Sequence, residues 1–79
     1  MPSYTYEERT RILARAREQV EDIALSESLD DVVWGKTYAA GYFAALEAVG
    51  AIDKSEATEL ARAVEQAERD AEDRLEPGE

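Results

Sequence analysis

Residues 32–49 carry almost no charge, and no other feature of the chain restricts its fold as strongly. Lys36 and Glu47 are the charged residues of this stretch, whereas 35% of the whole sequence is charged. A helix at the surface of a globular protein normally has an apolar stripe on one side and charged residues on the other. A helix with this sequence lacks the charged side, and it therefore needs neighbours around nearly its whole circumference.

Both ends of this uncharged stretch carry signals for the ends of a helix. Ser28, followed by Asp31 three residues later, is typical of an N-cap, and Asp30 is an equally good cap residue. At the other end, Gly50 can adopt the left-handed conformation with which many helices finish. The sequence therefore predicts a helix over residues 30–49.

Aromatic side chains form one stripe on this predicted helix. Trp34, Tyr38 and Tyr42 follow one another at four-residue spacing. Such a stripe usually belongs to a core, but Trp and Tyr are also the commonest anchors of protein interfaces. The hydroxyl groups of the two tyrosines need hydrogen-bond partners when they are buried, which favours a partly hydrated interface over a dry core.

Small side chains form a second, smooth face on the same helix. Its members are Ala40, Gly41, Ala44, Ala45 and Ala48. This face can receive the alanine-rich stripe of the helix predicted over residues 54–75 of the same chain, or the same helix of a second chain. Because the flanking helices each offer one apolar stripe, they cannot cover the whole circumference, and we expect apolar surface to be left over for a partner.

An amphipathic helix is predicted over residues 6–25. Thr5 and Glu8 have the spacing of a capping box, in which each side chain binds the backbone amide of the other residue. Apolar residues then recur at spacings of three and four, which is the helical repeat. They are Leu13, Ala16, Val20 and Ile23, widened by Ile12 and Ala24.

A third helix is predicted over residues 54–75. Asp53 and Glu56 resemble a second capping box, and Ile52 precedes the cap as in a hydrophobic staple. The apolar stripe of this helix is thin because alanine supplies most of it. Its members are Ala57, Leu60, Val64, Ala67, Ala71 and Leu75, broadened by Ala61.

The length of 79 residues predicts one all-α domain over residues 1–79, with a frayed tail at residues 76–79. We expect a small antiparallel bundle, or a helical hairpin, that completes its core by forming a homo-oligomer. A core of this size stabilises a chain by only about 3–5 kcal/mol. No cysteine is present to form a disulfide, so association with another chain is the remaining support. A dimer is the favoured oligomer.

The composition disfavours catalysis. Histidine and cysteine are both absent, which removes the usual neutral-pH base, the thiolate nucleophile and the common zinc ligands. The glycines do not form a phosphate-binding loop. We therefore expect no enzymatic activity, no catalytic residues, no metal site and no cofactor.

Acidic residues dominate the C-terminal third of the chain. The net charge is −10, which argues against direct nucleic-acid binding, and residues 53–79 hold four basic and ten acidic residues. Glu65, Glu68 and Glu72 form an acidic surface that is either simply hydrated or faces a basic partner. Two local pairs, Glu65–Arg69 and Asp70–Arg74, are expected to weaken its field.

The chain is expected to be cytoplasmic and not membrane-bound. Its N-terminal residues are acidic and aromatic, whereas a secretory signal begins with basic and then apolar residues. The longest uncharged run, residues 37–46, is far shorter than the roughly 20 residues that span a bilayer.

The segment from Tyr38 to Ile52 resembles small acidic helical accessory proteins of bacteriophages from GC-rich hosts. The shared pattern is a "GY-x-x-A-L" helix that ends at a glycine and is followed by an apolar residue and a capped helix, and the resemblance covers residues 34–68. It implies a protein that binds host proteins or defence complexes, and no catalytic residue carries over.

These observations predict a non-enzymatic protein-binding module that self-associates through its second helix and engages a host protein. The predicted interface residues are Trp34, Tyr38, Gly41, Tyr42, Ala44, Ala45 and Ala48. One alternative is an acidic DNA mimic of the antirestriction or anti-CRISPR type. A purely structural oligomer and a small-ligand site beside Trp34 are further alternatives.

Overall fold

Three helices make up nearly all of the computed structural model, which describes residues 4–76. They are α1 (Tyr6–Ala24), α2 (Leu29–Ala48) and α3 (Lys54–Leu75). No strand occurs within the described residues. The all-α prediction is confirmed, and each helix begins and ends within one residue of its predicted boundary. Of the predicted frayed tail, Glu76 follows α3 directly, while residues 77–79 lie outside the described part of the chain.

The predicted capping groups define the helix ends. Thr5 accepts a hydrogen bond from the Glu8 amide at 3.1 Å and its own amide donates to the Glu8 carboxylate at 2.8 Å, which completes the capping box of α1. Asp53 and Glu56 form the same reciprocal pair at the start of α3. Ser28, and not Asp30, caps α2 by accepting from the Asp31 amide at 3.1 Å.

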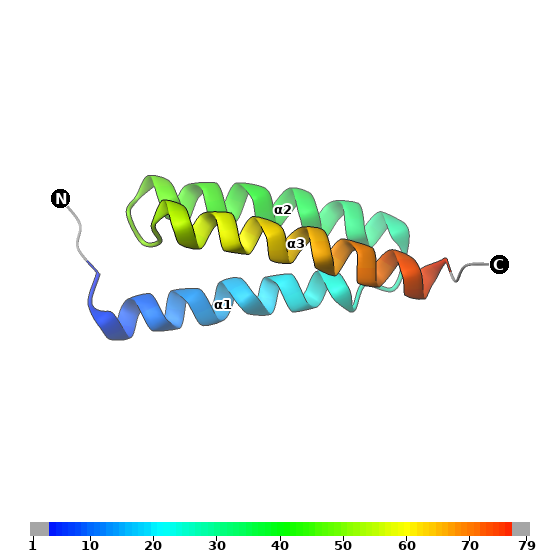
Figure 1. Cartoon of the computed structure of the whole chain (residues 1–79), viewed down its shortest axis with the longest axis horizontal. Coiled ribbons are helices and arrows are strands. Elements are labelled where there is room, and N and C mark those ends of the chain that lie inside the picture. The colour runs from blue at the N-terminus through cyan, green and yellow to red at the C-terminus, as the bar shows by residue number, and fades with distance from the viewer. Residues whose placement is uncertain (1–3, 77–79) are drawn as a thin grey trace.

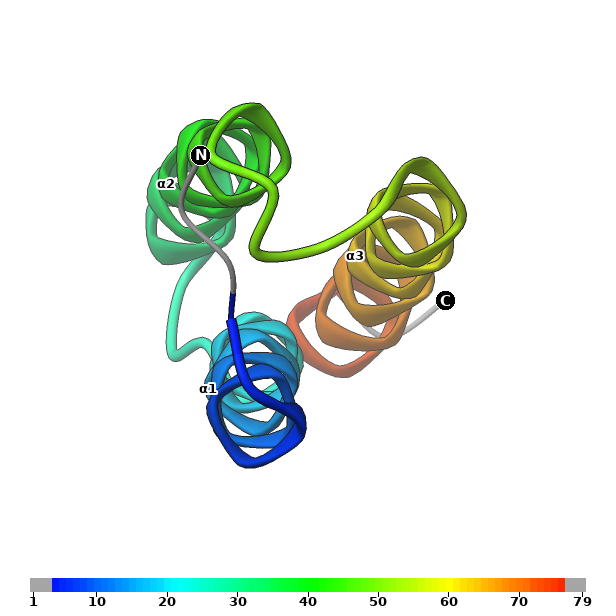
Figure 2. The same cartoon turned by 90° about the vertical axis from the view of Figure 1, so that its left-hand side faces the viewer.

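The helices form an elongated three-helix bundle in which α2 runs antiparallel to α1 and α3 (Figure 1). Viewed along the long axis, the helices occupy the corners of a triangle, and each contacts the other two (Figure 2). The principal extents are 52 × 19 × 18 Å. Gly50, with a φ of 78°, takes the predicted left-handed conformation in the turn from α2 to α3. None of the helices in the described residues is long and apolar enough to cross a membrane.

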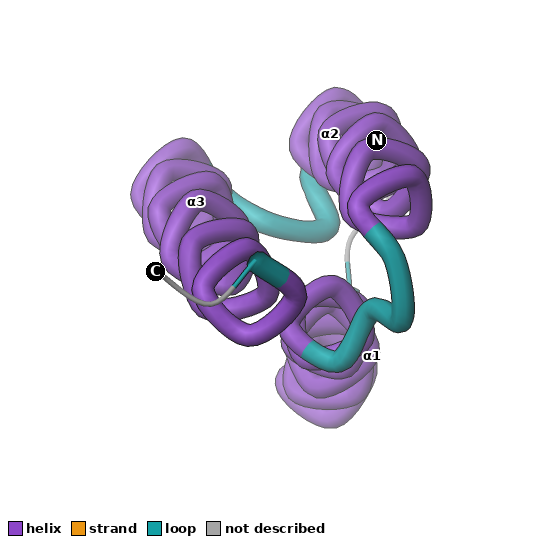
Figure 3. The backbone as a smooth tube through the Cα atoms, turned by 90° about the vertical axis from the view of Figure 1, so that its right-hand side faces the viewer, coloured by secondary structure: helices purple, strands orange, loops and turns teal. Residues whose placement is uncertain are grey.

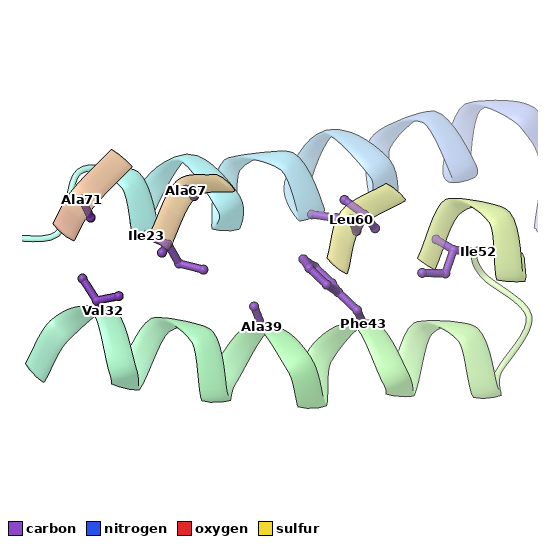
Figure 4. Close-up of a cluster of buried hydrophobic side chains, with 9 residues drawn as sticks. Ile23, Val32, Ala39, Phe43, Ile52, Leu60, Ala67 and Ala71 are labelled. Carbon is purple, nitrogen blue, oxygen red and sulfur yellow. The ribbon is translucent and has the colours of Figure 1, made fainter. Parts of the chain in front are cut away.

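The core is a narrow column of aliphatic side chains with one aromatic ring (Figure 4). Phe43 and Val32 point inward from α2, Ile23 comes from α1, and Leu60 comes from α3. Alanine fills the remaining buried positions of the three helices, namely Ala16, Ala39, Ala67 and Ala71. The predicted stripes of α1 and α3 therefore contribute to the core. Ile52, in the connection between α2 and α3, closes one end of it.

Ala61 is the one member of the predicted α3 stripe that the core does not cover. It is exposed at the edge of α3 that faces α2. The nearest residues of α2 on that side include Ala40 and Ala44, whose side chains are too short to reach across and bury it. The prediction that Ala61 broadens the core is therefore wrong.

Gly35 allows α1 and α2 to approach closely. A Cβ atom at this position would lie 2.9 Å from Cγ1 of Ile23, a distance that side chains do not tolerate. Ile23 is itself almost fully buried, with 1% of its surface exposed, so it has little freedom to move away. The sequence pattern pointed to Gly41 as the small residue of a helix contact, but no neighbour lies within 4 Å of a Cβ built on Gly41.

Polar contacts between helices replace the predicted contacts within α3. Arg74 donates to the carbonyl oxygens of Ala24 at 2.6 Å and Ser26 at 2.7 Å. These groups lie where α1 ends and the chain turns towards α2, at the same end of the bundle as the end of α3 (Figure 3). The α1 helix has no basic residue in its last turn, so Arg74 supplies the positive charge that favours a helix C-terminus.

The local pairs Glu65–Arg69 and Asp70–Arg74 do not form. Within residues 4–76 the ion pairs are Arg9–Glu56 at 2.8 Å and Lys36–Glu68 at 2.7 Å, and both join α3 to another helix. Arg69 instead donates to the Gln66 side chain within α3. The charged residues of α3 therefore hold the bundle together in part, and are not only a hydrated coat.

Candidate functional site

The side of α2 that points away from the core is the most unusual surface of the described residues. We call it the outer face of α2. Every residue in it is exposed, and its members are Trp34, Thr37, Tyr38, Gly41, Ala44, Ala45 and Ala48. The Trp34 side chain is 74% exposed and that of Tyr38 is 60% exposed. A helical repeat of 3.6 residues explains the arrangement, because these positions lie opposite the buried Val32, Ala39 and Phe43.

No charged side chain lies on the outer face between Trp34 and Ala48. The two charged residues in the body of α2, Lys36 and Glu47, both line the side that faces α3. Thr37 is the polar member of the face, and its hydroxyl donates to the Val33 carbonyl at 2.9 Å, which leaves its methyl group as the outward contact. The Tyr38 hydroxyl and the Trp34 indole N–H are thus the remaining polar side-chain groups. Desolvating this face therefore costs little, because few polar groups would lose water.

The aromatic stripe splits into an exposed and a half-buried part. Trp34 and Tyr38 are exposed, so the interpretation of the stripe as core is wrong for both residues. Tyr42 is half-buried and packs against the core. Its ring stacks on Tyr38, with centroids 5.9 Å apart, and lies 5.7 Å from the ring of Phe43. Tyr42 therefore anchors Tyr38 to the bundle but does not belong to the outer face.

The smooth face does not receive α3. Gly41, Ala44, Ala45 and Ala48 are all exposed, while α3 packs on the side of α2 that carries Phe43. Of the two interpretations for these residues, contact with α3 of the same chain is wrong. Contact with a second chain stays a prediction, and the small residues are free in the described bundle to make it.

A shallow groove separates α2 from α3 beside the outer face. It has a volume of about 520 Å³. Its lining is mainly apolar but includes four charged residues, and it comprises Lys36, Ala40, Phe43, Ala44, Glu47, Ala57, Thr58, Ala61, Arg62, Val64 and Glu65. Ala44 belongs to both the groove and the outer face, so the apolar surface of α2 continues from one to the other.

The predicted acidic surface is only partly free. Glu65 and Glu72 are exposed on α3. Between them, Glu68 is half-buried and holds the Lys36 ammonium group at 2.7 Å. Since one carboxylate of the three is neutralised by an ion pair, this face presents a weaker negative field than the sequence suggests.

Within residues 4–76, no group of three or more acidic side chains is placed to hold a metal ion. The pKa of Glu8 is lowered from its ordinary value of 4.5 by hydrogen bonding with the Thr5 backbone amide and then with the Thr5 side chain. That contact caps α1.

Sequence reasoning missed Thr37 and the groove. Thr37 lies three residues after Trp34 and four before Gly41, so the helical repeat places it on the same face. It was not assigned to the apolar face because threonine is a polar residue. Its hydroxyl group, however, donates a hydrogen bond to a carbonyl of the same helix. The groove had no sequence signal, since it depends on how far α3 stands from the short side chains of α2.

Comparisons of the chain with protein-family models, with curated proteins and with solved structures gave no match.

Proposed function

We propose that this protein is a non-enzymatic interaction module that binds protein through the outer face of α2. The observation that carries the proposal is the exposure of Trp34 on a helix face without charge. Tryptophan and tyrosine are the residues most enriched among interface hot spots. A chain with a net charge of −10 has many acidic residues with which to cover a helix, yet this face has none between Trp34 and Ala48.

The size of the apolar surface agrees with an interaction site. A Trp or Tyr side chain carries about 150–250 Å² of surface, so Trp34 and Tyr38 together present on the order of 300 Å². The largest apolar patch of an ordinary monomer measures roughly 300–600 Å² and is often functional. The small residues beside the two rings extend the patch without adding bulk, so a partner helix could lie close to the α2 backbone.

The acidic alternative has weaker support. A DNA mimic needs a dense array of free carboxylates, but Glu68 is paired with Lys36, and Arg62 and Arg69 lie among the acidic residues of α3. The resemblance to phage accessory proteins favours a host protein as a further partner of the module. The proposed contact is apolar, so its affinity depends on Trp34 and not on the carboxylates of α3.

A photo-cross-linking amino acid at Thr37 tests this proposal in cells that naturally encode the protein. Ala14, an exposed position on α1, provides the matched control. We expect ultraviolet light to produce protein adducts from position 37 and not from position 14, and the adducts should disappear when Trp34→Ala is added. Tyr6→Ala removes an aromatic ring that is 84% exposed but lies outside α2, and it should leave the adducts unchanged.

Equal adducts from positions 14 and 37, or adducts that persist in the Trp34→Ala variant, would contradict the proposal.

A further inference from the structure

We infer that the occupant of the outer face is a second copy of this chain, packed so that the two α2 helices run antiparallel with Gly41 at the two-fold axis. This inference rests on the proposed function and names the partner for the same face. It follows from the order of large and small residues along α2, from the distribution of charge and from the area that a dimer needs.

The large and small residues of the outer face lie in opposite halves of α2. Trp34 and Tyr38 precede Gly41, whereas Ala44, Ala45 and Ala48 follow it. Symmetric dimers use the same patch on both copies, so each half of the face must meet a half that complements it. Only an antiparallel pair brings the large half of one helix onto the small half of the other.

Gly41 is the natural centre of such a pair. Nothing lies within 4 Å of a Cβ atom built on it, so the missing side chain serves no contact inside the described bundle. Two helices centred there would approach closely, because no side chain separates their backbones at the axis. Trp34 lies seven residues before Gly41 and Ala48 lies seven residues after it. With Gly41 at the axis, Trp34 therefore lies against the partner's Ala48.

The neighbouring positions agree with the same register. Tyr38 lies three residues before Gly41 and meets the partner's Ala45, four residues after it. Thr37 similarly meets the partner's Ala44. Each contact sets a larger side chain against an alanine, which is the alternation that lets two helices interlock. A parallel pair would instead set Trp34 against the partner's Trp34 and leave the alanine halves apart.

Charge also favours self-association through this face in the antiparallel sense. Two copies that each carry −10 repel one another at most approaches, and the outer face of α2 is where an uncharged surface is available. Asp30 and Asp31 lie in the first turn of α2. An antiparallel pair holds the acidic ends of the two helices apart and sets their helix dipoles in opposition, whereas a parallel pair would bring four carboxylates together.

The available area suits a small dimer. Two copies of Trp34 and Tyr38 contribute roughly 600 Å², and a specific interface buries at least about 1,000 Å² in total. The rest of the outer face has to supply only about 200 Å² from each copy. Its remaining residues are all exposed, so this area is present.

The first test uses the purified full-length chain. Size-exclusion chromatography with light scattering should give twice the 8.8 kDa of one chain at micromolar concentration. Trp34 is the single tryptophan, so its emission reports directly on this contact. On dilution, the emission maximum should move to longer wavelength, towards that of water-exposed indole. The midpoint of this change should fall at the same protein concentration as the midpoint of the change in mass.

The second test uses cysteine pairs to determine the helix direction. The chain has no cysteine, so introduced thiols have no competitors. Disulfides form between residues whose Cα atoms lie within about 7 Å. We expect Gly41→Cys to cross-link with itself under mild oxidation. Thr37→Cys and Ala44→Cys should cross-link when mixed but not alone, and Ala14→Cys on α1 should give no dimer. Circular dichroism of each variant verifies that the helices persist.

Each result has one meaning. A monomeric wild type, or self-linking of Thr37→Cys without linking to Ala44→Cys, would overturn the antiparallel dimer. If the purified chain is monomeric but position 37 still gives adducts with another protein in cells, the proposed function stands and this inference fails. If neither adducts nor dimers depend on Trp34, both fail.

Discussion

The α2 helix buries Val32, Ala39 and Phe43, and α3 buries Leu60, Ala67 and Ala71, so both give the core a stripe of similar width. Their outward surfaces differ completely. α3 presents glutamate, arginine and aspartate, while α2 presents aromatic rings and alanine. Since both outward surfaces accompany equally good inward packing, the fold does not require α2 to lack charge. The difference supports the proposal that the outer face of α2 is an interaction surface.

The largest difference is expected between Phe43 and Trp34, which are aromatic residues on opposite sides of α2. Phe43→Ala removes a ring that is only 5% exposed and should lower the free energy of unfolding by about 3–5 kcal/mol. That loss equals the stability expected of the whole core, so much of the variant should be unfolded. Trp34→Ala should change the stability of the monomer by less than about 0.5 kcal/mol.

Urea titrations followed by circular dichroism, at concentrations low enough to keep the chain monomeric, measure both changes. Comparable destabilisation by the two substitutions would mean that Trp34 belongs to the core after all.

The two glycines of α2 give a smaller and more specific contrast. Gly35→Ala puts a methyl group 2.9 Å from Ile23 and should lower the free energy of unfolding by about 1–2 kcal/mol, because overpacking costs more than helix propensity returns. Gly41→Ala meets no neighbour and should stabilise the monomer by up to about 1 kcal/mol.

In the antiparallel dimer, however, Gly41→Ala places two methyl groups at the axis. The substitution should raise the monomer's midpoint in urea and weaken self-association in light scattering. An improvement in both properties would place the axis elsewhere.

Arg74 tests whether the polar surface of α3 contributes to the fold. Arg74→Gln removes a charged donor from the end of α1 and should lower the free energy of unfolding by about 1 kcal/mol, at the low end for charged hydrogen bonds because the site is exposed. Arg69→Gln provides the control, since Arg69 contacts only Gln66 of its own helix among the described hydrogen bonds. Chemical denaturation of the two variants should separate them, and equal stabilities would show that the Arg74 contact contributes nothing.

Most of the fold could be predicted because its signals are local. Caps such as Thr5 and Asp53 act within four residues, and the apolar repeats of α1 and α3 extend over whole helices. The partners of Arg74 and the close approach at Gly35 could not be predicted, because residues some fifty or twelve positions away determine them. Likewise, the exposure of Trp34 depends on the way three helices share a core that one phenylalanine and several alanines already fill.

The candidate site was predicted in outline for the same reason. Its members Trp34, Gly41 and Ala45 stood out through their spacing along one helix, which needs no knowledge of the other two. Tyr42 was assigned to the same surface, but it lies close enough to Phe43 to be half-buried. Gly41 and Tyr42 are adjacent in the sequence, yet Gly41 is exposed and Tyr42 is half-buried. Which of the two is covered depends on the direction from which α1 packs against α2.

The smallest effect is expected from the acidic surface of α3. Changing Glu65, Glu68 and Glu72 to glutamine together keeps helix propensity high and reduces the net charge from −10 to −7. Of the three, only Glu68 forms an ion pair within the described residues, and its side chain is 25% exposed. We therefore expect the triple variant to lose less than about 1 kcal/mol of stability, with the single Glu68→Gln variant accounting for the loss.

Added salt should have opposite effects on association through α2 and on association through α3. Added salt shortens the Debye length from about 10 Å at 0.1 M to about 3 Å at 1 M, which screens both attraction and repulsion between exposed charges. Self-association through the uncharged face of α2 should strengthen slightly with salt, because two copies of charge −10 repel less. The triple glutamine variant should associate at least as tightly as the wild type, for the same reason. A complex held by the carboxylates of α3 would behave oppositely, since salt would weaken it and the triple variant would lose it. Light scattering over this range of salt, on both proteins, therefore distinguishes an apolar contact through α2 from an electrostatic one through α3.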